Sequence, residues 1–359
     1  TFNENKDPLV KNKIKGKVKL IYIDPPFATE QDFKGNKGQK AYSDKAKGAE
    51  FVEFLRRRLM LMHEILADDG SIFVHLDWKK AQYLKVVMDE VFGENNFVNE
   101  IIWHYSDNFQ GNVNGFAVNH NNIFWYSKSD VYTANKVMIP LKGAVQRDKR
   151  IWSKELGKLV SARDKHGRLI YVEFTEKKAD DVWEIGQSST TKSASKEYIG
   201  YPTQKPEELL RRVILAASEP DDIVMDVFAG SGTTLAVAEK LGRRWIGCDI
   251  GKLAIYTIQK RLLEIEESKN LSNPKTNYGK VAKSFGIVTS GLYDLGKIFA
   301  LQKDEYIRFI KDLFEIEETK TAKVGGVDID GKKREFFTKI FPYWELKNAS
   351  VDEKYLQEL

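Results

Sequence analysis

Short apolar runs alternate with helical periodicity along most of this chain. The runs predict strands at residues 18–24, 71–76, 97–104, 121–127, 222–227 and 244–248. Apolar residues three or four apart predict helices at 50–67, 79–91, 206–218, 232–241 and from 251 onward. This alternation predicts an α/β fold: a doubly wound, mostly parallel Rossmann-like sheet, with ligand loops at the carboxyl ends of its strands.

The first predicted strand ends in Asp24-Pro25-Pro26-Phe27, a set of groups suited to a planar base. Prolines lack an N–H, so their carbonyls remain available as acceptors. A carboxylate and a backbone carbonyl can accept the two N–H bonds of an exocyclic amino group while an aromatic ring stacks on the base. Taken alone, the same four residues are explained equally well by an ordinary turn.

A second candidate site follows the predicted strand 222–227. The segment Phe228-Ala229-Gly230-Ser231-Gly232-Thr233-Thr234 is typical of a strand, a glycine turn and a helix start, where unpaired N–H groups are available to a ligand. The next predicted strand ends at Asp249, and a carboxylate in that place suits ribose hydroxyls. No Lys-Ser or Lys-Thr pair follows the glycines, which argues against a phosphate-binding P-loop. Together these features favour an adenosine-containing ligand.

A third motif, Tyr201-Pro202-Thr203-Gln204-Lys205-Pro206, directly precedes an amphipathic helical pattern. Proline is common in the first turn of a helix. By itself the segment predicts a helix N-terminus and nothing more.

Taken in chain order, the three motifs resemble those of the β-class DNA adenine-N6 amino-methyltransferases of bacterial restriction-modification systems, and most closely the type III modification subunits. In that circularly permuted class the catalytic half precedes the cofactor half. The resemblance runs from near the start of the chain to about Arg261 and includes residues 66–77 and 121–128. It implies a methyltransferase domain divided as follows: a catalytic half at 1–130, an inserted target-recognition region at 131–200 and a cofactor-binding half at 201–268.

The resemblance implies S-adenosylmethionine as methyl donor and assigns residues to it. Asp24, Pro25, Pro26 and Phe27 would form the catalytic loop. The residues implied around the donor are Thr203, Lys205, Asp226, Phe228, Gly230, Gly232 and Asp249. An initial Asp rather than Ser is usual for adenine, so adenine outranks cytosine as the target. The family commonly has Tyr at the position of Phe27, so stacking is kept here and a phenolic hydrogen bond is lost.

Charge and composition favour DNA as a partner and argue against a metal site, a disulfide and a membrane span. The net charge is only +5, but residues 131–200 hold fourteen Lys or Arg against nine Asp or Glu, so phosphate contacts are expected there. The five histidines form no metal-ligand pair by spacing, so no metal site is expected. One cysteine, Cys248, allows no internal disulfide and fits a reducing cytoplasm. No apolar run is long enough to predict a membrane span. Double-stranded DNA, a restriction subunit and a second copy of the chain are the expected partners.

The two ends of the chain are less informative. Residues 268–274 are typical of a linker, and 275–359 predict a small α+β accessory region with an amphipathic helix around Tyr306 and a hairpin turn at Asp330-Gly331. Family members usually carry a Gly-Asp-rich cofactor-contacting segment before the catalytic strand, and residues 1–17 contain no clear copy. Because the sequence begins at Thr1, omission of such a segment remains open.

Three other functions compete with this interpretation. Methylation of cytosine N4 or of RNA would use the same motifs. A nicotinamide dehydrogenase would explain the glycine turn and Asp249, but Leu235 stands where a third glycine is expected and Asp24 to Phe27 would have no role. A catalytically silent DNA-recognition subunit would bind DNA without methyl transfer.

Overall fold

The computed structural model describes residues 14–27, 31–34, 40–44, 48–105, 107, 114–187, 195, 197–288, 302–314, 316–321, 323–324, 326–333 and 335–340. It divides the chain into two compact units, Thr1–Ser284 and Phe285–Leu359. Of residues 1–17, which contain no clear copy of the cofactor-contacting segment, residues 1–13 lie outside the described residues. Among the described helices, none is long and apolar enough to cross a membrane.

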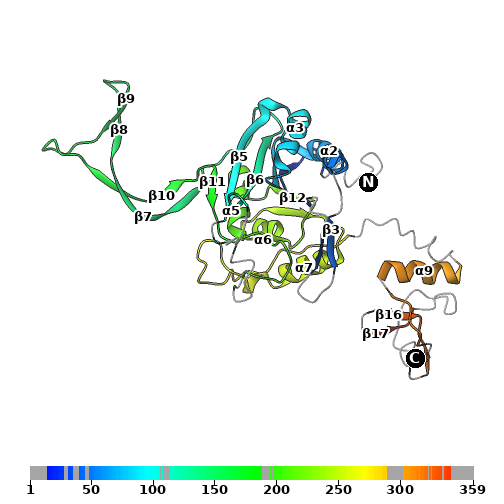
Figure 1. Cartoon of the computed structure of the whole chain (residues 1–359). Helices are drawn as coiled ribbons and strands as arrows, with labels where there is room; N and C mark the ends of the chain where they lie inside the picture. The colour runs from blue at the N-terminus through cyan, green and yellow to red at the C-terminus, as the bar shows by residue number, and fades with distance from the viewer. Residues whose placement is uncertain are drawn as a thin grey trace. The chain divides into compact units, whose positions relative to one another are not determined.

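A seven-stranded sheet forms the centre of the first unit, in the order β11-β5-β6-β4-β1-β12-β13 (Figure 1). The strands are β1 (Val18–Ile23), β4 (Leu66–Asp77), β5 (Phe97–His104), β6 (His120–Ser127), β11 (Val182–Glu184), β12 (Ile223–Asp226) and β13 (Arg244–Gly247). Only β6 runs antiparallel to its neighbours β4 and β5, and the other pairs are parallel. The predicted mostly parallel sheet is therefore confirmed.

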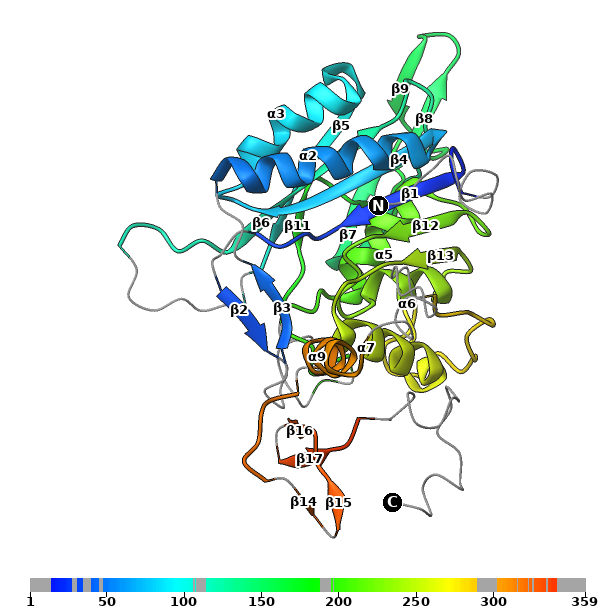
Figure 2. The same cartoon turned by 90° about the vertical axis from the view of Figure 1, so that its right-hand side faces the viewer.

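Helices cover both faces of this sheet, as Figure 2 shows. The helices α2 (Gly48–Ile65) and α3 (Ala81–Phe92) lie on one face, and α5 (Glu207–Ala217) and α6 (Thr233–Lys240) lie on the other. The alternation of side chains in β1 explains why both faces are apolar: Ile21 and Ile23 pack in the core under α2 and α3, whereas Leu20 and Tyr22 pack in the core under α5 and α6. The doubly wound arrangement is confirmed.

The central pair of strands marks the place where the direction of winding changes. The chain passes from β1 through α2 to β4 on one side, and from β12 through α6 to β13 on the other. The neighbours β1 and β12 are parallel, with Leu20 opposite Val224 and Ile21 opposite Met225. Ligands of such sheets bind beyond the carboxyl ends of the strands at this kind of switch point. The loops that follow Ile23 and Asp226 leave the sheet there.

A long two-stranded ribbon (residues 138–178) is inserted between β6 and β11, and Figure 1 draws it leaving the sheet near β11. Its base pairs β7 (Met138–Asp148) with β10 (Tyr171–Lys178), and its far end pairs β8 (Arg150–Ser153) with β9 (Lys158–Ser161). All eight residues of β10 are exposed. The ribbon lies inside the predicted target-recognition region.

Shorter elements complete the first unit. These are β2 (Gln31–Lys34), β3 (Lys40–Asp44), α7 (Lys252–Leu263) and the 3-10 turns η1 (Glu94–Asn96) and η2 (Ile265–Glu267). The expected linker at 268–274 is instead hydrogen-bonded to its surroundings: the carbonyl of Ser268 accepts from the Tyr278 N–H, and Asn270 donates to the Thr276 carbonyl. The boundary between the units comes later, at Ser284.

The second unit contains α9 (Lys303–Phe314) and two hairpins, β14 (Lys323–Val324) with β15 (Val327–Asp328) and β16 (Gly331–Lys333) with β17 (Phe336–Thr338). The predicted helix around Tyr306 is confirmed. The predicted turn at Asp330-Gly331 is wrong, because Gly331 is the first residue of β16, opposite Thr338. A Cβ at Gly331 would lie 2.7 Å from the Glu317 carbonyl oxygen, so close backbone approach explains this glycine.

Candidate active site

The catalytic loop predicted from the sequence, Asp24 to Phe27, leaves the carboxyl end of β1. Asp24 has a buried environment in which its two carboxyl oxygens differ. The Lys205 ammonium donates a hydrogen bond to Oδ2, while Oδ1 is buried and has no hydrogen-bond partner among the described residues. Burial raises the pKa of Asp24, and the charge and hydrogen bond of Lys205 oppose that rise. An unpartnered buried acceptor is unfavourable unless a ligand donates to it.

His75, on the neighbouring strand β4, lies beneath this loop. Its Nδ1 is 2.8 Å from the Tyr22 hydroxyl and 3.9 Å from Asp24 Oδ1, and its Nε2 is 2.9 Å from Asn121 Nδ2. The Phe27 ring is tilted against the imidazole, with centroids 6.0 Å apart. Burial, assisted by the charge of Lys205, places the pKa of His75 well below its ordinary value, so the ring is neutral.

Spacing along the chain gives His75 no metal-ligand partner, and the sequence assigned it no role in the site. It is fully buried, and it also touches the catalytic loop. A signal existed: His75 stands near the carboxyl end of a strand, and parallel neighbours bring such ends to one edge of the sheet. The sequence could not reveal that β4 would lie beside β1.

The glycine turn after β12 is held by two carboxylates. Asp226 accepts from the Phe228 N–H at 2.9 Å and from the Thr234 hydroxyl at 2.6 Å. Asp249 accepts from the N–H groups of Gly230 at 2.8 Å and Gly251 at 2.7 Å. Asp226 therefore acts on the shape of the turn, since both its oxygens face the turn and the start of α6.

The two glycines of this turn have positive φ, +49° for Gly230 and +73° for Gly232. That backbone region favours glycine. A Cβ at Gly232 would also lie 2.8 Å from Ile258 Cγ1 on α7, so a side chain would press the turn away from that helix. The turn thus brings bare backbone and the N-terminus of α6 to the edge of the sheet where β1 also ends.

The Tyr201–Pro206 segment connects the two loops. A Cβ at Gly230 would lie 3.5 Å from the Tyr201 ring, which places that ring against the glycine turn. The Lys205 carbonyl accepts from the Thr233 hydroxyl at 3.2 Å, while the Lys205 side chain reaches Asp24. Lys205 was predicted to lie near the methyl donor; in this structure its backbone contacts the start of α6 and its ammonium contacts Asp24.

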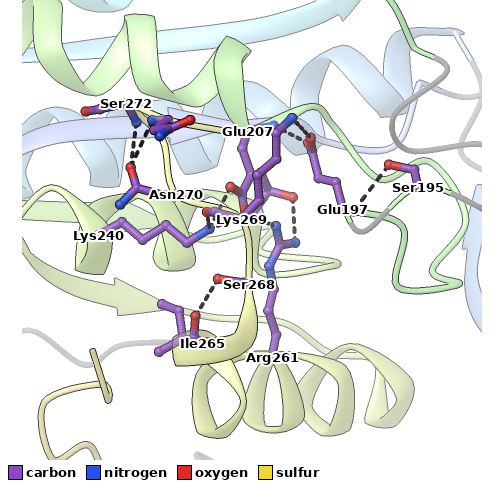
Figure 3. A network of polar contacts seen from close by, with 12 residues as sticks. Ser195, Glu197, Glu207, Lys240, Arg261, Ile265, Ser268, Lys269, Asn270 and Ser272 are labelled. Atoms are coloured by element: carbon purple, nitrogen blue, oxygen red, sulfur yellow. Dashed lines mark hydrogen bonds and ion pairs between the residues drawn. The ribbon is translucent and has the colours of Figure 1, made fainter. Parts of the chain in front are cut away.

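A buried network of charges fixes the N-terminus of α5 to α6 and α7 (Figure 3). Glu207 pairs with Lys240 at 2.7 Å and with Arg261 at 2.9 Å. Arg261 also donates to the Ser231 carbonyl and the Thr233 hydroxyl of the glycine turn. Glu197 accepts from the Glu207 N–H, which extends the network toward the Tyr201–Pro206 segment. These contacts hold the segment and the glycine turn in one arrangement.

The residues present fit S-adenosylmethionine. A backbone turn without side chains, a helix N-terminus and a carboxylate at the end of the next strand would hold the adenosine and amino acid parts of that molecule. When bound, S-adenosylmethionine supplies a methyl group bonded to a positively charged sulfur. The fold and the donor fit together define an α/β methyltransferase, in which the Asp24–Phe27 loop and the glycine turn follow neighbouring strands at one switch point.

Comparison with known proteins gives the family. Residues 18–260 match the model of the N6_N4_Mtase family, described as DNA methylase. The chain belongs to this family, and it is therefore an S-adenosylmethionine-dependent DNA methyltransferase. The match spans both loops and the ribbon between them.

Several curated proteins are similar to this chain. The type II methyltransferase M.EcaI of Enterobacter cloacae is 31% identical over 311 residues, covering 72% of this chain and 68% of that protein. The DNA adenine methyltransferase YhdJ of Escherichia coli (strain K12) is 29% identical, with 68% and 76% covered. A probable type III HindVI Mod subunit of Haemophilus influenzae is 26% identical; 69% of this chain matches 48% of that subunit, about half its length.

Among solved structures, the M1.HpyAVI–SAM complex matches with a TM-score of 0.43 and 20% identity, covering 71% of this chain and 92% of that one. The cytosine-N4-specific PvuII DNA methyltransferase matches with a TM-score of 0.45 and 17% identity, covering 70% and 81%.

The Asp226 carboxyl makes a testable contribution to pH dependence. Burial is the largest cause that raises its pKa from 3.8 to about 7. The folded state therefore holds this proton more tightly than the unfolded state, and the resulting stabilisation is full below about pH 4 and lost as pH rises to about 7. Asp226→Asn keeps the acceptor for the Phe228 N–H. The substitution should remove a pH-dependent contribution of up to about 4 kcal/mol to the free energy of unfolding.

Urea unfolding at pH 5 and pH 8 measures this effect. The stability of Asp226→Asn relative to wild type should be higher at pH 8 than at pH 5. Asp68→Asn, at a side chain that is 99% exposed, is the control and should show no such change. An equal difference at both pH values for Asp226→Asn would contradict the prediction.

Proposed function

We propose that this chain transfers the methyl group of S-adenosylmethionine to the N6 amino group of an adenine rotated out of a DNA duplex. The observation that carries the proposal is the buried, unpartnered Oδ1 of Asp24 beside Phe27, at the edge of the sheet shared with the glycine turn. An acceptor in that position suits an amino N–H, and an aromatic ring next to it suits the face of a base.

The chemistry requires an acceptor of this kind. The lone pair of an adenine amino nitrogen is delocalised into the ring, and it must be localised on nitrogen before the new N–C bond can form. Asp24 Oδ1 and the Pro25 carbonyl would accept the two N–H bonds and favour a pyramidal nitrogen. This binding is stronger in the transition state than in the ground state. The donor would supply the methyl group and keep the electron pair of the broken C–S bond on its sulfur, and the positively charged amino nitrogen would then pass one proton to water.

Positioning of the reacting groups and stacking of the base also affect the rate of methyl transfer. Holding the nucleophile in line with the methyl group can lower the barrier by roughly 7–11 kcal/mol. Rotation of the adenine out of the stack costs a few kcal/mol, and stacking on Phe27 would offset about 1–3 kcal/mol of that cost. The absence of a phenolic hydroxyl at Phe27 leaves stacking as the contribution of that side chain.

The ribbon at residues 138–178 is proposed to bind the DNA duplex. A two-stranded β-ribbon has dimensions that fit the major groove. Trp152 is 63% exposed and lies among basic residues of β8, β9 and the strands that support them. Basic side chains would contact phosphates, and the apolar side chains between them would face base edges or sugars.

Adenine as the target rests on the initial Asp of the catalytic loop and is supported by the relative named as a DNA adenine methyltransferase, YhdJ. The Mod subunit relative supports a restriction subunit as a partner, and a second copy of the chain remains a proposed partner as well. A reducing cytoplasm, predicted from the single cysteine, also remains a proposal.

The test uses labelled S-adenosylmethionine and bacterial genomic DNA that lacks adenine methylation, followed by analysis of the nucleosides. Label in N6-methyladenine is expected. Label in N4-methylcytosine would contradict the choice of base while leaving the reaction class, and label only with RNA as acceptor would contradict DNA as substrate. Binding of DNA and donor without any transfer would favour the silent recognition subunit.

A further inference from the structure

Lys205 lies where the two halves of the site meet, and its backbone and side chain contact different halves. Its backbone carbonyl accepts from Thr233 at the start of α6. Its ammonium donates to Asp24 Oδ2 and, at 3.1 Å, to the carbonyl of Thr203. The side chains of Lys205 and Asp24 are only 11% and 18% exposed, so water screens this pair weakly.

The backbone that presents Lys205 is strained. Thr203 has φ of +59°, a conformation that is rare for a β-branched residue. Strain of this kind persists where surrounding contacts hold it, and it is concentrated at functional sites. Here the Lys205 ammonium holds the Thr203 carbonyl and the Asp24 carboxyl at the same time, which ties the strained turn to the catalytic loop.

The groups around Asp24 make Lys205 the main source of positive charge at its carboxyl. Facing the carboxyl are the Tyr22 phenol from its own strand, the His75 imidazole from β4 and the Lys205 ammonium from the segment before α5. Asp226 on β12 interacts with it electrostatically. His75 and Tyr22 are neutral, and Asp226 adds negative charge when ionised. Lys205 is thus the cation in direct contact with Asp24 in the described part of the site.

We propose that Lys205 is a positioning residue for methyl transfer: its ammonium occupies Asp24 Oδ2, keeps the carboxyl ionised in a buried site and leaves Oδ1 for the target amino group. This inference rests on the proposed function. The contacts divide the two oxygens between two tasks, because Oδ2 is bound by Lys205 and Oδ1 alone remains as an acceptor. An ionised Asp24 can accept from the Lys205 ammonium on Oδ2 and from an amino N–H on Oδ1. A protonated Asp24 carries its proton on one of these oxygens, so it would be a weaker acceptor for one of the two partners.

Three variants test this role in the full chain. Lys205→Met removes the ammonium and keeps the length of the side chain, and Lys205→Arg restores a positive charge. Lys19→Met is the matched control, because Lys19 also lies on a partly buried surface, at 14% exposure, and also pairs with an aspartate, Asp69, but at the opposite end of β1. For each variant, donor affinity, kcat and the pH profile of kcat/KM are measured.

With Lys205→Met, methyl transfer at pH 7 should fall by roughly tenfold or more, with donor affinity close to wild type. The acid limb of the kcat/KM profile should move to higher pH, because loss of Lys205 raises the pKa of Asp24. Lys205→Arg should recover most of the activity and the wild-type limb. An unchanged acid limb in Lys205→Met would overturn the inference, as would a loss of donor binding with normal pH dependence.

A second measurement separates this inference from the proposed function. The Asp24 carboxyl is titrated by NMR in ¹³C-labelled protein, assigned by comparison with Asp24→Asn. The titration should move to higher pH in Lys205→Met and stay in place in Lys19→Met. This holds whether or not the wild type methylates adenine. An unmoved Asp24 titration would overturn the role of Lys205 even in an active enzyme, and absent adenine methylation by the wild type would count against the proposed function alone.

Discussion

Asp24→Asn is expected to lower the kcat for methyl transfer by at least about 10²–10³-fold. Asparagine has nearly the volume of aspartate, and its carbonyl oxygen can still accept from Lys205. Its amide nitrogen would then occupy the place of Oδ1, so a donor would face the N–H groups of the target amino group. The charge that favours the pyramidal nitrogen would be lost as well.

Donor affinity should change little, because the glycine turn and Asp249 follow β12 and β13 and lie outside the loop that follows β1. Kinetics with labelled donor and calorimetric titration of the donor measure the two quantities separately. Asp69→Asn is the matched control, since Asp69 also pairs with a lysine that projects from β1. Normal kcat in Asp24→Asn would refute the proposed catalytic loop.

Shortening the ribbon is expected to weaken DNA binding by about 10²-fold or more at moderate salt, with donor binding intact. Gln146 and Glu173 are directly opposite each other in the β7–β10 ladder. Residues 147–172 can therefore be replaced by Asn-Gly, which suits a two-residue hairpin turn. The removed segment carries eight Lys or Arg against three Asp or Glu, a net charge equal to the whole chain's +5.

Fluorescence anisotropy with duplex DNA over a range of salt concentrations measures this effect. The dependence of log K on log salt should become flatter by about 0.9 for each phosphate contact that is lost. A full-length ribbon in which Lys154, Lys158 and Lys165 are changed to Gln controls for loss of the fold, because it keeps the strands. Equal affinity and equal salt slope in the shortened protein would place the DNA-binding surface elsewhere.

The sequence predicted the positions of the Asp24–Phe27 loop and the glycine turn because each depends on local chemistry. Asp24 to Phe27 follow an apolar run that forms a strand buried on both faces. Gly230 and Gly232 adopt the positive φ that glycine allows. The strands and helices that were predicted in the methyltransferase domain agree with the structure to within a few residues for the same reason, since periodicity is a local property. The ribbon strands β7 to β10 and the edge strand β11 were not predicted. The turn at Asp330-Gly331 was misplaced because the sequence does not distinguish a glycine required for close packing from a glycine required for a turn.

By itself, the sequence determined the doubly wound fold, the motif order and the positions of the two loops, because these follow from local periodicity and residue type. Only the tertiary structure decided that Lys205 contacts Asp24, that His75 lies beneath Phe27 and that Arg261 holds the glycine turn. Asp24 and Lys205 are 181 residues apart in the chain. No local pattern encodes such a pair, since it forms only when β1, β4 and β12 align in one sheet and bury the carboxyl between them.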